Sequence, residues 1–235
     1  MINKIHTYGC SFSYPFWIDE EKTYTHLVSK EYNCDYTNRS FPALCNDEIF
    51  NNLTNDLNQF VKNDLIIYQF TSIYREGFHI NEETYFSTAG ISRDHGENKV
   101  MLDKWSGGRD KFQVTDNQID TLLDYTDSWS IHSIKHRFYR VYNLLEYLKN
   151  NVGIKYRFLF LDNFFNRFPE METSIKFPIK NNYNNVSILD WVVENKLTLS
   201  DTNTGVHPND KHPNEFGHQE IANKIISSIK PTKLI

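Results

Sequence analysis

The sequence predicts an α/β fold in which helices flank a parallel sheet, and two patterns carry this prediction. Short apolar runs of strand length alternate along the chain with longer segments whose apolar residues recur every three or four positions. A strand, a helix and a strand that follow one another at this spacing form βαβ units, which build parallel sheets. Ligands of such sheets bind at the carboxyl ends of the strands, so the residues that follow each apolar run are the first candidates for a functional site.

The first strand is predicted in the apolar run from Ile2 to Tyr8, which stops at Gly9. Glycine adopts backbone angles closed to other residues, so Gly9 lets the chain turn sharply and present the next side chains at the strand's carboxyl end. Ser11 is a candidate nucleophile there, although serines after strands are more often turn formers. The neighbouring Cys10 is the alternative nucleophile, but successive side chains diverge after the glycine, and we expect its thiol to point into the core.

The next elements continue the alternation up to residue 70. We expect a helix from Thr23 to Tyr32, a brief strand from Cys34 to Thr37, a helix capped by Asn46 or Asp47, and a buried strand from Leu65 to Phe70. The second of these helices is indicated by an apolar set at helical spacing: Ile49, Phe50, Leu53, Leu57, Phe60 and Val61.

The second half of the chain supplies the remaining elements. Helical spacing from about Asn117 to Asn150 predicts a long helix, and Gly153 separates it from a fourth strand, Tyr156 to Leu161. A short helix is expected through Trp191, and a closing helix from Gln219 to Ile229.

Two polar segments interrupt this pattern, at about 74–114 and 163–185. Long loops inside compact domains are usually functional or disordered, so we interpret the first as an insertion over the active-site edge, with an irrelevant surface excursion as the alternative. It contains a strand-like patch at Glu83 to Ser87. Arg75, at its start, is either a weak candidate for substrate binding or half of an exposed ion pair with Glu76.

A second candidate for the functional site, besides Ser11, lies near the carboxyl terminus, where Asp210, His212 and Pro213 follow one another closely. Proline disfavours helical angles in the preceding residue, so His212 is expected to be extended, and Pro213 can start the helix that follows. The carboxylate of Asp210 can then meet one ring nitrogen of His212, which leaves the other free to take a proton from a serine. With Ser11, these residues reproduce the division of labour of a Ser-His-Asp triad.

The two ends of the chain together resemble the SGNH/GDSL hydrolase superfamily, in which a serine follows the first strand and an Asp-x-x-His or Asp-x-His-Pro element closes the chain. The segment Pro42 to Asp47 is similar to the second family block, with Ala43 where most members have a glycine whose amide faces the oxyanion. The third block, Gly-x-Asn in most members, has Gln69 and Thr71 at those two positions. The side-chain donor to the oxyanion is therefore either the Thr71 hydroxyl or the amide of Asn46.

The resemblance implies a flavodoxin-like three-layer α/β/α sandwich with a parallel sheet of about five strands, and a serine esterase that needs no metal or organic cofactor. Ser11 attacks an ester carbonyl after His212 takes its proton, Asp210 orients His212, and water later releases the acyl group. The implied oxyanion donors are the backbone amides of Ser11 and Ala43 with a side chain from Asn46 or Thr71.

The substrate is predicted to be a small-molecule or carbohydrate ester with a short acyl group, acetyl above all. The two polar segments mix amides and charges with scattered aromatics, a composition that can bond hydroxyls and stack on sugar rings. A lipase, a thioesterase or an acyltransferase on the same fold is an alternative. A degenerate family member that binds a ligand or glycan without cleaving it is a further alternative, because the third block is altered.

Two other chemistries compete with this interpretation. The segment Gly9 to Ser13 only approximates the nucleophile elbow of an α/β-hydrolase, and its serine comes too early in the chain. His132 and His136, four apart on a helix, lack a third partner and are interpreted as surface residues. A metal-binding hydrolase would instead use a cluster near the carboxyl terminus: His207, Asp210, His212 and His218.

Length and composition bound the remaining possibilities. A chain of 235 residues, 39% hydrophobic and 15% aromatic, is predicted to form a single domain over 1–235 with a substantial core. The net charge of -5 and the absence of a basic run argue against nucleic acid and anionic membranes. No signal peptide or membrane span is visible, so we expect a soluble, cytoplasmic-type protein. The odd set of cysteines predicts free thiols: Cys10, Cys34 and Cys45.

Overall fold

A computed structural model gives the fold and describes residues 1–15, 17–42, 44–72, 77–81, 84–87, 131–161, 187–201 and 210–229. Its strands are β1 (Lys4–Tyr8), β2 (Asp35–Asn38), β3 (Leu65–Phe70), β4 (Gly77–Asn81), β5 (Thr84–Ser87) and β6 (Lys155–Phe160). Its α-helices are α1 (Tyr24–Tyr32), α2 (Asn46–Asn55), α6 (Ile131–Asn151), α9 (Ile188–Glu194) and α10 (Glu215–Ile229), and short 3-10 turns span Glu20–Lys22, Leu57–Gln59 and Leu199–Asp201.

The main sheet is parallel, and its order in the described part of the chain is β2-β1-β3-β6. This is the flavodoxin-like order, in which the second strand lies on one side of the first and the third on the other. The α/β prediction is therefore confirmed, with four of the expected strands inside the described ranges. The two connections out of β1 lead to opposite sides of it, so the crevice between β1 and β3 is the topological switch point of the sheet.

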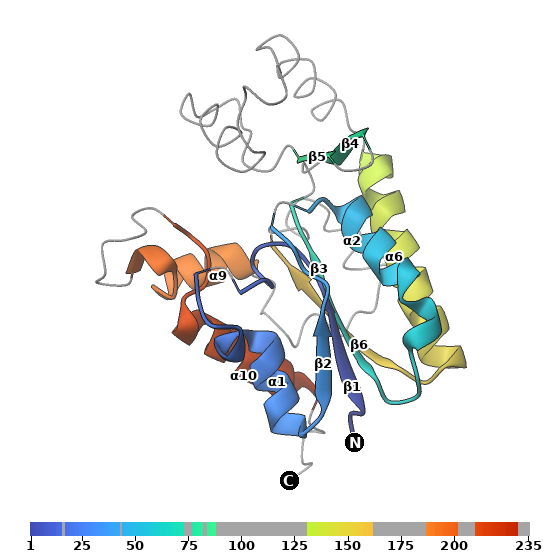
Figure 1. The fold of residues 1–235 in the computed structure, drawn as a ribbon, viewed down its shortest axis with the longest axis horizontal. Coiled ribbons are helices and arrows are strands. Elements are labelled where there is room, and N and C mark those ends of the chain that lie inside the picture. The colour runs from blue at the N-terminus through green and yellow to red at the C-terminus, as the bar shows by residue number, and fades with distance from the viewer. Residues whose placement is uncertain are drawn as a thin grey trace.

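The helices form two layers with the sheet between them (Figure 1). On one face α1 packs against α10, with α9 on the same side, and on the other face α2 packs against α6. Every residue of β3 is buried, which explains why its sequence is apolar except for Gln69, because a central parallel strand is covered on both faces. Aromatic rings of β3, β6 and α6 form a connected part of the core: Phe70, Phe138, Phe158 and Phe160.

A separate antiparallel hairpin, β4 and β5, lies within the first predicted insertion. The strand-like patch expected from Glu83 to Ser87 is found as β5, and β4 is its partner. Of the second insertion, 163–185, no residue lies in the described part of the chain. Among the described helices none is long and apolar enough to cross a bilayer. The three cysteines are free thiols, as expected, and Cys10 is fully buried.

Several element boundaries differ from the sequence-based expectation. The closing helix begins at Glu215 rather than Gln219, because Asn214 caps it by accepting a hydrogen bond from the Gly217 amide at 2.9 Å. Pro213 does not start this helix and instead pairs as an isolated bridge with Thr198. The expected cap of α2 was also wrong: Cys45 holds that position, and Asn46 is the first helical residue.

Candidate active site

The turn after β1 carries Ser11 at the carboxyl edge of the sheet. It is closed by a hydrogen bond from the Ser13 amide to the Cys10 carbonyl, 3.0 Å, and the Ser13 carbonyl in turn accepts from the Asn38 side chain at 2.7 Å. Ser11 is 8% exposed, so its hydroxyl lies in a nearly closed setting at the end of the strand.

Gly9 is needed in this turn for a different reason from the one the sequence suggested. Its backbone is not in the left-handed region; among the described glycines only Gly153 has a positive φ. A Cβ on Gly9 would instead lie 2.5 Å from the Ser13 hydroxyl oxygen and 2.6 Å from the side-chain oxygen of Gln69. The requirement at this position is therefore space for two neighbouring side chains.

The segment that carries Asp210 and His212 is hydrogen-bonded to the 3-10 turn that follows α9. The Leu199 amide donates to the His212 carbonyl at 2.8 Å, and the Ser200 amide donates to the Asp210 carbonyl at 2.9 Å. The extended conformation that Pro213 favours at His212 stays a prediction. His212 lies at a bend in the chain, and these backbone hydrogen bonds hold it in place.

Ser11, His212 and Asp210 form one continuous hydrogen-bonded chain, although the first two are 201 positions apart. The distance from Ser11 Oγ to His212 Nε2 is 2.8 Å, and that from His212 Nδ1 to Asp210 Oδ1 is 2.6 Å. The same carboxylate oxygen also accepts from the His212 backbone amide at 2.9 Å. A carboxylate facing Nδ1 favours the tautomer with its proton there, which leaves Nε2 able to accept from the serine.

The imidazole of His212 is also held by packing. The ring of Phe12 lies against it with 4.7 Å between ring centroids and a tilt of 40°. The side chains of His212 and Asp210 are 20% and 19% exposed, so both are screened from solvent without being sealed from it. The arrangement can therefore accept a proton and still admit a substrate.

The two candidates for a side-chain oxyanion donor differ in what they already bond. Asn46 accepts from the Thr71 amide at 2.9 Å and donates to the carbonyls of Thr71 and Ser72 at 3.4 and 3.2 Å. Its amide group is therefore committed to the exit of β3. The Thr71 hydroxyl is buried and has no hydrogen-bond partner among the described residues.

Thr71 follows β3, the strand adjacent to the one that precedes Ser11. Tyr8 of β1 is in register with Tyr68 of β3, so Ser11 and Thr71 each lie three residues beyond a paired position on adjacent strands.

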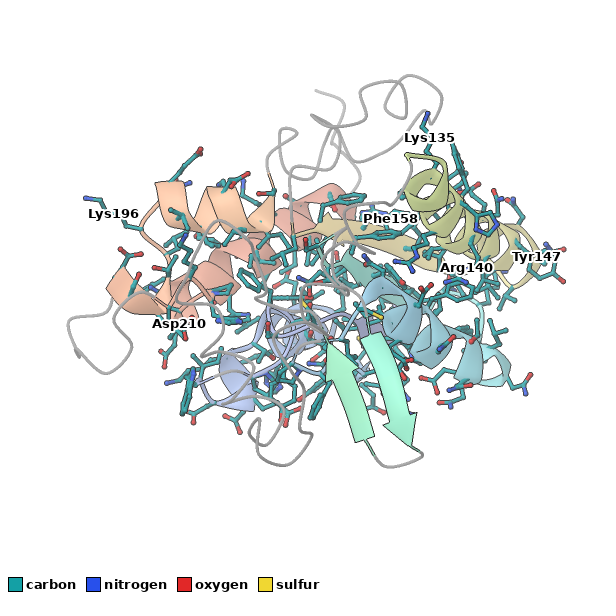
Figure 2. The ribbon with its side chains drawn as sticks, turned by 90° about the horizontal axis from the view of Figure 1, so that it is seen from above. Lys135, Arg140, Tyr147, Phe158, Lys196 and Asp210 are labelled. Carbon is teal, nitrogen blue, oxygen red and sulfur yellow. The ribbon has the colours of Figure 1, made fainter. Side chains whose placement is uncertain are left out.

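Figure 2 shows the molecule from above and places Asp210 near α9 and α10, with Arg140 on α6 on the opposite side. Two further sequence-predicted site residues, Ala43 and Arg75, lie outside the described residues.

The proposed metal cluster is only partly within the described ranges, because His207 is outside them. His218 is buried; its Nδ1 accepts from the Tyr24 amide at 3.2 Å, and its ring stacks on that of Tyr24. Burial, with a smaller contribution from His212, lowers the pKa of His218 to about 3, so it is neutral at ordinary pH. Within the described part of the chain no group of three or more His, Cys, Asp or Glu side chains has a metal-binding arrangement.

Two residues beside the nucleophile, Ser13 and Tyr24, had no role in the sequence-based prediction. Both are fully buried, and Tyr24 donates to the Ser13 hydroxyl at 2.5 Å. Ser13 in turn donates to Gln69, which the sequence marked only as a departure from a glycine. The sequence signal that could have indicated this contact was the combination of Gly9 with Gln69, because a bulky side chain on one strand requires a small residue next to it on the neighbouring strand.

No protein-family model matches this sequence, and no curated protein matches it. Solved structures do. The psychrotrophic esterase EstA from Pseudoalteromonas sp., in a form inhibited by monoethylphosphonate, is 14% identical with a TM-score of 0.48, covering 97% of each chain. A putative lipolytic protein of the G-D-S-L family from Desulfitobacterium hafniense DCB-2 is 12% identical with a TM-score of 0.45, covering 97% of this chain and 99% of its own. The acetyl xylan esterase AlAXEase is 11% identical with a TM-score of 0.37, covering 96% and 99%.

Proposed function

We infer that this chain is a serine esterase of the SGNH type. The observation that carries the proposal is the hydrogen-bonded chain from Ser11 Oγ through the His212 ring to the Asp210 carboxylate. Free serine is a weak nucleophile, and a base within hydrogen-bond distance is the arrangement that activates it. Here the base is itself oriented by an acid, which completes the required set of roles.

The reaction proceeds in two halves. Ser11 Oγ bonds to the ester carbonyl carbon while its proton passes to His212 Nε2, and Asp210 stabilises the imidazolium. The tetrahedral intermediate then breaks its bond to the alcohol, which leaves with the proton from His212. In the second half, water gives a proton to His212 and attacks the acyl-serine, releasing the acid and restoring the serine hydroxyl.

The negative charge of the tetrahedral intermediate needs preorganised donors. We assign this role to the backbone amides of Ser11 and Ala43 and to the hydroxyl of Thr71. The Thr71 hydroxyl is buried and without a partner in the described part of the chain, which supports its choice over Asn46, whose amide hydrogens are already used by two carbonyls.

The finer part of the proposal is the substrate: a short acyl group, acetyl, removed from a carbohydrate. Its support among the described residues is an aromatic pair beside the nucleophile turn. Tyr14 and Phe41 meet edge to face with 5.6 Å between centroids, and the Phe41 amide donates to the Gly9 carbonyl at 3.3 Å. Phe41 is 59% exposed, so its ring can stack on the apolar face of a sugar.

The enzymatic proposal is tested with p-nitrophenyl acetate and a phosphonate ester that labels active serines. A burst of nitrophenol, and loss of activity on covalent labelling of Ser11, are expected, and exhaustive chelation should leave the rate unchanged. Activity that survives complete labelling of Ser11, or that requires a metal, would exclude the serine mechanism. No burst and no turnover with any ester would instead favour a protein that binds a ligand without cleaving it.

The substrate proposal has its own test. A short acyl site discriminates by roughly 1 to 3 kcal/mol per misfit methylene, so turnover should fall steeply from acetyl to butyryl esters. Phe41→Ala should raise KM for an acetylated oligosaccharide and leave the hydrolysis of p-nitrophenyl acetate unchanged. A preference for octanoyl or longer chains would point to a lipase or thioesterase and overturn this part alone.

A further inference from the structure

A buried chain of hydrogen bonds runs beneath the turn that carries Ser11. The side-chain oxygen of Gln69 accepts from the Cys10 amide at 3.2 Å and from the Ser13 hydroxyl. The Ser13 oxygen accepts in turn from the Tyr24 hydroxyl at 2.5 Å. One oxygen atom on β3 therefore holds the residues on both sides of the nucleophile.

The contact between Gln69 and the end of β1 is too close to be incidental. A Cβ on Gly9 would lie 2.6 Å from the Gln69 oxygen and 2.9 Å from its Cβ, closer than real Cβ atoms approach other atoms. Gln69 has no exposed surface. The glycine at the strand end and the glutamine on the adjacent strand therefore fit one another, and replacing either disturbs the turn.

The same chain of hydrogen bonds extends to α10, the helix that follows the base His212. Tyr24, the first residue of α1, donates its backbone amide to His218 Nδ1 at 3.2 Å, and the two rings stack with centroids 5.8 Å apart. His218 lies in the first turns of α10, the helix that begins just after His212. Tyr24 thus contacts both the turn of the nucleophile and the helix that follows the base, two parts of the chain more than 200 residues apart.

We propose that Gln69, Ser13 and Tyr24 are positioning residues that set the distance between Ser11 Oγ and His212 Nε2. The proposal rests on the esterase function inferred above. It also gives a purpose to Gln69, which stands where the resembling family has a glycine. Proximity catalysis is steep in distance: a misplacement of about 1 Å can cost on the order of 100-fold in rate. A hydrogen bond that merely stabilised the fold would leave the rate per folded molecule unchanged.

The first test removes single polar groups with little change in volume. Tyr24→Phe and Ser13→Ala are each expected to lower kcat for p-nitrophenyl acetate by about 10- to 100-fold, with KM changed less than about threefold, since neither side chain contacts substrate. The rate at which a small phosphonate ester labels Ser11 should fall in parallel.

Tyr156→Phe is the matched control. Its hydroxyl donates to Glu146 at 2.5 Å from a side chain that is also buried, but on β6 and away from the turn. This variant should lose a similar amount of thermal stability and keep the wild-type kcat. Equal kcat in Tyr24→Phe and Tyr156→Phe would overturn the proposal, because the Tyr24 hydroxyl would then serve stability alone.

A double variant tests whether the residues act as one unit. The Tyr24 hydroxyl acts through Ser13, so Ser13→Ala with Tyr24→Phe should be no slower than Ser13→Ala alone. Multiplying effects would show two independent roles and contradict a chain. The inference fails separately from the function it rests on: if Ser11→Ala abolishes turnover and Tyr24→Phe does not change it, the esterase stands and the positioning role is wrong.

Discussion

At the scale of single residues, substitutions in the proposed triad give the most direct test of the mechanism. Ser11→Ala and His212→Ala should each reduce ester turnover by about 10⁴-fold or more, because each removes a member of a unit that works only when complete. Asp210→Asn should cost about as much, since an amide facing Nδ1 favours the wrong tautomer. Turnover is measured with p-nitrophenyl acetate, and thermal melting checks that the fold is intact. Ser11→Ala within about tenfold of wild type would contradict the mechanism.

A second prediction about single residues distinguishes Thr71 from Asn46 as the side-chain donor to the oxyanion. Thr71→Val keeps the shape and removes a hydroxyl that no described residue bonds, so kcat should fall about 100- to 1000-fold with little change in stability. Asn46→Ala removes the three hydrogen bonds that hold the exit of β3 and should lower the free energy of unfolding by about 1 to 3 kcal/mol. Reduced kcat in Asn46→Ala with an unchanged melting temperature would reverse the assignment.

What the sequence revealed about these residues depended on how local the information was. Asp210 and His212 are two positions apart beside a proline, so their mutual placement is written into a short segment. Ser11 follows a strand end far away in the sequence, and its meeting with His212 was an expectation drawn from the complementary roles of the three side chains and from a resemblance. The choice between Thr71 and Asn46 stayed open because it depends on hydrogen bonds across 25 positions, which no periodicity reports.

At the scale of elements, the start of α10 is fixed by a close approach to the loop after α9. A Cβ on Gly217 would lie 2.6 Å from the carbonyl oxygen of Leu197, which begins the segment that is hydrogen-bonded to residues 210–214. Alanine is favoured over glycine in a helix by about 1 kcal/mol, but a contact this short with backbone cannot be relieved by a rotamer change. Gly217→Ala should therefore lower both the melting temperature and kcat.

A neighbouring substitution controls for the change to alanine itself. Gln219 is exposed two residues further along α10, so Gln219→Ala should leave the melting temperature and kcat near those of the wild type. If Gly217→Ala were as stable and active as Gln219→Ala, the position of α10 would not depend on this contact.

The elements themselves were predictable where apolar periodicity was long, and their ends were not. The strand from Leu65 to Phe70 was placed correctly because burial on both faces leaves an almost continuous apolar run. The two strands before it were placed within a residue or two, although β2 is polar and only partly buried. The closing helix was placed four residues late because its first turn is polar or exposed, including Phe216 at 75% exposure, and follows no apolar period. Its true start is marked by the capping side chain of Asn214.

At the scale of the whole molecule, two buried histidines make stability depend on pH. Burial lowers the pKa of His6 despite its contact with Asp64 at 3.2 Å, and burial lowers that of His218 to about 3. In the unfolded chain both titrate near 6.5. Above that pH both histidines are neutral in the folded and the unfolded chain, so they do not change the free energy of unfolding. As the pH falls below 6.5, the unfolded chain binds protons at these histidines and the folded chain does not.

The free energy of unfolding should therefore fall as pH drops from about 7.5 to 5, by up to about 1.4 kcal/mol per pH unit for each histidine well below 6.5. Urea unfolding at several pH values measures this slope, and the carboxylates add to it mainly at lower pH. His218→Asn, whose side-chain oxygen can replace Nδ1 as the acceptor for the Tyr24 amide, should flatten the slope, whereas the exposed His136→Gln should not. An equal slope in His218→Asn and wild type would show that His218 is protonated in the folded protein, and its place in the core beside Tyr24 would need another explanation.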